Sequence, residues 1–132
     1  MTISVTPELP VALWDGECGF CRRWIGRWRE RTAGRVQFYA YQTVSPQFLA
    51  AHDIAVEDLA AAMHFVDEDG AVYRGAAAVF AALRRSNERR YAALDAAYRR
   101  VPGFSFVADA VYRFIARHRA AAGRVSKLLM GD

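Results

Sequence analysis

Two cysteines separated by two residues, in the segment Asp-Gly-Glu-Cys-Gly-Phe-Cys at positions 15–21, constrain this chain most. Cys18 and Cys21 are the only cysteines in the sequence. Residues 10–14 before them form an apolar run typical of a strand, and the apolar residues of 20–28 after them recur at helical spacing. We therefore expect Cys18 at or just before the first turn of a helix, where the helix dipole and free N–H groups favour a thiolate.

The spacing of the two cysteines allows a reversible disulfide. Residues three apart on a helix lie about 5–6 Å apart at Cβ, whereas a disulfide needs about 3.8 Å, so a slightly loosened first turn closes the gap. In this interpretation Cys18 attacks a substrate disulfide. Cys21, one turn further along and expected to be the more shielded thiol, resolves the mixed disulfide. The Cys18–Cys21 disulfide is then the redox centre, and we expect no separate cofactor and no metal.

The residues around the cysteines suggest further roles. Asp15 either hydrogen-bonds backbone N–H groups in the turn or accepts a proton from Cys21 during resolution. The aromatic cluster that follows is expected to face the core, although its first member, Phe20, could instead flank a substrate groove. The residues expected to flank the substrate are Trp14, Gly19, Phe20 and Arg22.

Composition limits the possible functions. With 132 residues the chain is one domain, and its hydrophobic content of 54% is enough for a core. No stretch is apolar enough for a membrane span and no secretory signal is visible, so we expect a cytoplasmic protein, in which a CxxC pair is catalytic or metal-binding. The net charge is +4, but arginine provides all basic residues except Lys127, which indicates GC-rich, bacterial coding. Nucleic acid is therefore not an expected partner. The arginines concentrate after residue 84, either as a solvated helical face or as a functional patch.

The sequence pattern predicts an α/β fold. Strands are expected at about 10–14 and 36–41 and in a hairpin of 63–66 with 71–73, and helices at 19–32, 46–52, 56–61, 76–86, 88–100 and 105–120. The order β-α-β-α-β-β-α is typical of a thioredoxin-like fold with a mixed four-stranded sheet, helices on both faces and two extra C-terminal helices. The core would cover about 10–86 and the helical extension about 88–120. The last helix is expected to pack its apolar stripe on the core, with membrane-surface or nucleic-acid contact as alternatives.

These features together resemble the DCC family of thiol-disulfide oxidoreductases, also called DUF393. The family motif D-G-x-C-x-x-C appears here as residues 15–21. Weaker family features follow in order: Asp69-Gly70, Tyr73, Gly75, Ala78, Val101-Pro102, Tyr112 and Ala116-Arg117-His118-Arg119. The chain departs from the family at Ala76, where a polar residue is frequent, and at His118, where asparagine is frequent. It also has Ala61-Ala62-Met63 where thioredoxin-like proteins place a cis-proline before the third strand.

The resemblance implies thiol–disulfide exchange with a disulfide-bearing protein or a low-molecular-weight thiol. Two alternatives remain. One is a non-catalytic thioredoxin-like binding or accessory module. The other is a metal half-site, in which the CxxC pairs of two chains share one zinc ion. The sequence indicates no particular oligomeric state.

Overall fold

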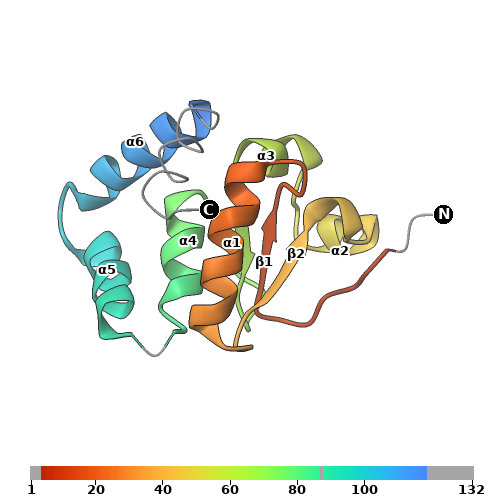
Figure 1. Ribbon diagram of the computed structural model, residues 1–132, viewed down its shortest axis with the longest axis horizontal. Helices are drawn as coiled ribbons and strands as arrows, with labels where there is room; N and C mark the ends of the chain where they lie inside the picture. The colour runs from red at the N-terminus through yellow and green to blue at the C-terminus, as the bar shows by residue number, and fades with distance from the viewer. Residues whose placement is uncertain (1–3, 87, 119–132) are drawn as a thin grey trace.

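A mixed four-stranded sheet with helices on both faces forms the centre of the structure (Figure 1). The computed structural model describes residues 4–86 and 88–118, without the side chain of Phe20. The strands are β1 (Val11–Trp14), β2 (Gln37–Ala40), β3 (His64–Val66) and β4 (Val72–Arg74). The helices are α1 (Gly19–Thr32), α2 (Pro46–Ala51), α3 (Val56–Ala61), α4 (Ala76–Leu83), α5 (Arg89–Arg100) and α6 (Phe104–Arg117), and a 3₁₀ turn, η1 (Tyr41–Thr43), follows β2.

The strand order is β2-β1-β3-β4. β1 runs parallel to β2 and antiparallel to β3, and β3 and β4 form the predicted hairpin. This arrangement confirms the expected α/β, thioredoxin-like class. In the parallel pair, Trp14 lies opposite Ala40. The loops that leave the carboxyl ends of β1 and β2 therefore emerge side by side, and the cysteine motif lies in the first of them.

The boundaries of α1 agree with the predicted range 19–32 and have local causes. Cys18 is the N-cap residue, with extended backbone angles, and the last turn carries Arg29 and Arg31, whose charge suits the negative end of the helix. The chain leaves the helix through Ala33, which adopts the left-handed conformation at φ 48°. Gly34 follows with φ 84°, also in the left-handed region.

The sheet separates two hydrophobic cores. On one face α1 and α4 pack against β1, β2 and β3; this core contains Ala12, Ile25, Val36, Phe38, Met63, Phe65, Ala78, Ala81 and Ala82. On the other face α2 and α3 cover the sheet; this core contains Val11, Leu13, Val44, Phe48, Leu49, Ile54, Leu59 and Val66. Because side chains alternate along β1, its neighbouring residues belong to opposite cores, which fixes the register of the strand that precedes the cysteines.

The last helix does not pack its apolar stripe on the core, so that prediction was wrong. The side chains that form the stripe are exposed: Phe106 by 73%, Val107 by 60%, Val111 by 52% and Phe114 by 64%. α1 and α4 already cover this face of the sheet, and α6 packs on α4 and α5 instead (Figure 1). Phe104 on α6 contacts Phe80 on α4, with 6.2 Å between the centroids of the two rings. No helix in the described part of the chain is long and apolar enough to cross a membrane.

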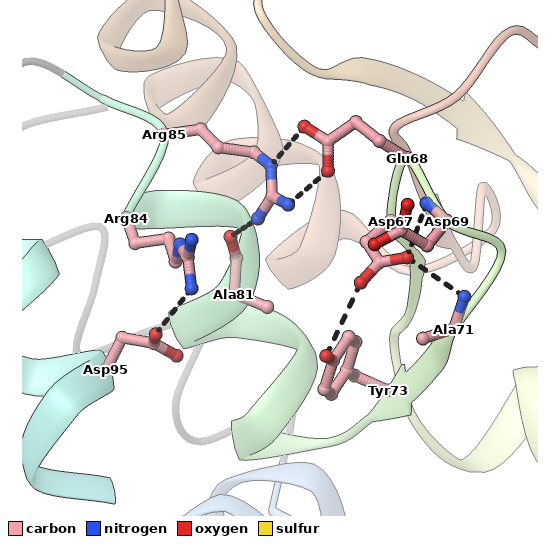
Figure 2. A network of polar contacts seen from close by, with 9 residues as sticks. All are labelled: Asp67, Glu68, Asp69, Ala71, Tyr73, Ala81, Arg84, Arg85 and Asp95. Carbon is pink, nitrogen blue, oxygen red and sulfur yellow. Dashed lines mark hydrogen bonds and ion pairs between the residues drawn. The ribbon is translucent and has the colours of Figure 1, made fainter. Parts of the chain in front are cut away.

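Charged contacts attach α5 and the hairpin to α4 (Figure 2). The Asp95 carboxylate on α5 is buried. It accepts a hydrogen bond from Arg84 at 3.4 Å and forms an ion pair with Arg99, one turn along the same helix, at 3.2 Å. Arg85 at the end of α4 pairs with Glu68 in the hairpin turn, and this contact lowers the pKa of the Glu68 carboxyl. The Arg84–Asp95 pair joins the helical extension to the thioredoxin-like core, whereas the Arg85–Glu68 pair lies within that core.

Candidate active site at the amino end of α1

Cys18 and Cys21 lie in the first turn of α1 and are not joined by a disulfide. The backbone N–H of Cys21 donates to Sγ of Cys18 at 3.2 Å. The chain enters the helix through a bond from the N–H of Cys18 to the carbonyl of Asp15 at 3.2 Å. The predicted position of Cys18 at the start of a helix is therefore confirmed, with an N–H donor placed where it would stabilise negative charge on sulfur.

The exposure of the two cysteines is the reverse of what we expected. Cys18 is buried, with 9% of its surface exposed, whereas Cys21 is only half-buried. The Cys18 side chain folds back onto the first turn of its own helix as a capping group. Cys21 instead lines an open pocket. The prediction that Cys21 is the more shielded thiol was wrong, because helix position alone does not determine what covers a side chain.

The side chain of Gln42 fixes the Asp-Gly turn before the cysteines. Asp15 Oδ1 accepts from the N–H of Glu17 at 3.0 Å and from Nε2 of Gln42 at 2.9 Å. The N–H of Gly16 donates to Oε1 of the same Gln42 side chain at 3.1 Å. Asp15 thus hydrogen-bonds a backbone N–H group in the turn, which is one of the two roles expected from the sequence. One of its carboxylate oxygens accepts from two donors.

Sequence reasoning missed Gln42. It lies 27 residues after Asp15, in η1, and no local pattern connects the two. One signal was present: Gln42 is a polar residue soon after β2, and neighbouring parallel strands end at the same edge of a sheet.

Gly16 lies too close to β2 for any other residue. A Cβ added at this position would be 2.8 Å from Cβ of Ala40 and 3.2 Å from Oε1 of Gln42. Carbon atoms in contact normally lie about 3.5–4.0 Å apart. The glycine of the D-G pair is therefore required by close packing between this turn and the end of β2.

A pocket of about 70 Å³ lies beside Cys21. Asp15 and Cys21 both line it, together with apolar side chains from α1, α4 and α6. The lining residues are Trp14, Asp15, Cys21, Trp24, Ile25, Trp28, Leu59, Ala62, Met63, Val79, Tyr112, Ile115 and Ala116. The dithiol thus adjoins a mostly apolar space, and the C-terminal helix forms one wall of it.

The four residues expected to flank a substrate do not all line the pocket. Trp14 lines the pocket, and its buried Nε1 has no hydrogen-bond partner among the described residues. Gly19 and Arg22 are exposed and do not line this pocket. The prediction for Phe20 concerns a side chain outside the described part of the structure.

The segment before β3 is held by the C-terminal helix. The N–H of Met63 donates to the hydroxyl of Tyr112 on α6 at 2.9 Å. No proline precedes β3; among the described residues the cis peptide bond is Leu9–Pro10, before β1. The backbone group next to the pocket is thus satisfied by a side chain that sequence reasoning did not assign to the site.

Metal ligands do not gather in the described part of the chain: it contains no group of three or more His, Cys, Asp or Glu side chains able to hold an ion. His64 is buried on β3, where burial lowers its pKa below 6.5, and its Nδ1 lies 3.1 Å from the carbonyl of Ala62. Its side chain does not line the pocket beside Cys21.

The geometry agrees with a comparison to known families. A protein-family model described as DCC1-like thiol-disulfide oxidoreductase matches residues 12–125. The matched region contains both cysteines, the turn before them and each helix of the described residues. No curated protein and no solved structure matches the chain. Because the family model matches most of the sequence, the chain belongs to the DCC1-like family of thiol-disulfide oxidoreductases.

Proposed function

We propose that Cys18 and Cys21 cycle between a dithiol and a disulfide and so exchange thiols and disulfides with a substrate. One observation carries this proposal: the two sulfurs share the first turn of α1, where the N–H of Cys21 lies 3.2 Å from Sγ of Cys18. Family membership supports the reaction class. The open pocket beside Cys21 supports access to the pair.

The reaction proceeds in two balanced steps. The Cys18 thiolate attacks one sulfur of a substrate disulfide, the substrate S–S bond breaks, and one substrate thiolate leaves and takes up a proton. The Cys21 thiolate then attacks Sγ of Cys18 in the mixed disulfide, forms the Cys18–Cys21 disulfide and releases the second substrate thiol. Two electrons pass from the protein to the substrate. The reverse sequence, with a thiol as reductant, restores the dithiol.

The structure supports different roles for the two cysteines. Cys18 has the N–H donor that favours its thiolate, and its 9% exposure restricts attack to a sulfur that docks against the amino end of α1. Cys21 shares the pocket with Asp15. In our proposal the Asp15 carboxylate takes the proton of Cys21 during resolution, while it also holds the turn.

Trapping the mixed disulfide tests the function and the roles together. With a small disulfide as substrate, Cys21→Ser is expected to accumulate a mixed disulfide at Cys18, detected by intact mass. Cys18→Ser should form adducts much more slowly, and the native protein should release two substrate thiols per cycle. Stable adducts formed only at Cys21 would reverse the roles. A native protein that never oxidises with substrate disulfides would instead favour the non-catalytic binding module.

A further inference from the structure

A second, larger groove adjoins the cysteine pocket. It has a volume of about 890 Å³ and runs between the end of α3, the edge strand β4, the start of α4 and the inner side of α6. Ala62, Tyr112 and Ala116 line both the groove and the pocket beside Cys21. A molecule bound in the groove would therefore lie next to the pocket that Cys21 lines.

The charge of the groove is positive. Arg74 from β4 and Arg113 and Arg117 from α6 line it, against a single carboxylate, Asp109, which accepts from the Tyr98 hydroxyl at 2.8 Å. Arg113 and Arg117 are exposed and form no ion pair with another described residue. Two guanidinium groups one helical turn apart are thus available to a ligand.

Two further features favour an anion in this groove. Arg74 lies 3.9 Å from Asp58, and both side chains are largely exposed, so this weak contact leaves its guanidinium available. The amino end of α4 opens onto the groove through Gly75, Ala76 and Ala77, and no side chain caps it. The positive end of that helix adds to the potential that the arginines create.

We propose that this groove binds the carboxylates of a small anionic disulfide and places its sulfur–sulfur bond at the amino end of α1. This inference rests on the proposed function and names its substrate class. The groove volume falls within the roughly 300–1,000 Å³ of small-molecule sites. The arginines supply the charge complement of carboxylates, and the apolar pocket next to Cys21 receives the part of the molecule that carries sulfur.

The test compares two small disulfides of similar length and different charge. Dithiodiglycolate carries two carboxylates, and hydroxyethyl disulfide carries none. The measured quantity is the ratio of kcat/KM for the anionic disulfide to kcat/KM for the neutral one. The double variant Arg113→Gln/Arg117→Gln is expected to lower this ratio about fivefold to tenfold, mainly through KM, since each exposed ion pair contributes only modestly.

A charge-matched control separates the groove from the general field of a basic protein. Arg89 and Arg100 on α5 are exposed and do not line the groove. Arg89→Gln/Arg100→Gln should therefore change the ratio less than about twofold, although it removes the same charge. Raising the ionic strength should lower the ratio of the native protein toward that of the groove variant.

The outcomes distinguish this inference from the function on which it rests. Turnover of both disulfides, with the same ratio in native protein and groove variant, would overturn the anionic groove and leave the exchange reaction intact. No oxidation of the dithiol by either disulfide would overturn the proposed function itself. If Arg113→Gln/Arg117→Gln lowers kcat/KM only for a disulfide-linked acidic peptide and not for dithiodiglycolate, the groove binds a protein segment. That result would overturn the proposal of a small substrate.

Discussion

Replacing Gly16 with alanine should disturb the turn that presents the cysteines. The added Cβ would lie 2.8 Å from Cβ of Ala40, which is about 0.7–1.2 Å closer than carbon atoms normally approach. The neighbour is a Cβ fixed to the backbone of β2, so it cannot rotate away. The turn or the end of the strand must move, and we expect a cost of about 1–3 kcal/mol, the usual range for overpacking.

A double-mutant cycle isolates this contact. Ala40→Gly removes the atom that the new Cβ meets, and by itself should cost about 0.5–1 kcal/mol as a glycine in a strand. If the clash is the cause, Gly16→Ala should cost at least 1 kcal/mol less in the Ala40→Gly background than in the native protein. Urea unfolding of the four proteins gives the four free energies of unfolding.

The same four proteins report on the site. Movement of the turn breaks the hydrogen bonds that Gln42 makes to Asp15 and Gly16, so Gly16→Ala should also slow oxidation of the dithiol. Ala40→Gly should restore part of the rate. Our reasoning fails if Gly16→Ala unfolds at the same urea concentration as the native protein, or if the two substitutions are additive.

Three further predictions concern single titratable side chains. Asp15→Asn keeps the turn but cannot take the proton of Cys21, so stopped-flow release of the second substrate thiol should slow about 10²-fold; an unchanged rate refutes the proton role. Burial lowers the pKa of His64, so its contribution to the unfolding free energy is complete above about pH 6.5 and decreases as the pH falls toward the lower folded value. His64→Gln should flatten that part of the profile, and parallel profiles for the two proteins would contradict this. Asp95→Asn leaves two half-exposed arginines without their buried counter-charge and should cost about 1–2 kcal/mol in urea unfolding, less than a fully buried pair.

Elements with local signals were predicted well. α1 was placed correctly because the Asp-Gly turn and the helical spacing of the apolar residues both lie within residues 15–32. The second helix was predicted at 46–52 and lies at Pro46–Ala51, where the Ser45 hydroxyl accepts from the N–H of Phe48 and Pro46 occupies the first position. The hairpin predicted at 63–66 with 71–73 is present, with Asp69-Gly70 in the turn between its two short strands.

The wrong predictions concern which neighbouring elements cover a side chain. The apolar stripe of α6 was assigned to the core because periodicity shows that a helix has an apolar side. Periodicity does not show which neighbours cover that side, and in the structure α1 and α4 already occupy the sheet. The exposure of Cys18 and Cys21 was reversed for the same reason.

The sequence by itself determined the family and the place of the thiols, because a CxxC pair between a strand and a helix is a local arrangement. The tertiary structure decided the environment of those thiols. Gln42 reaches Asp15 from the 3₁₀ turn after β2, Tyr112 reaches Met63 from α6, and three arginines from two elements line one groove. Contacts of this kind join residues far apart in the chain, and only the packing of helices on a sheet brings them together.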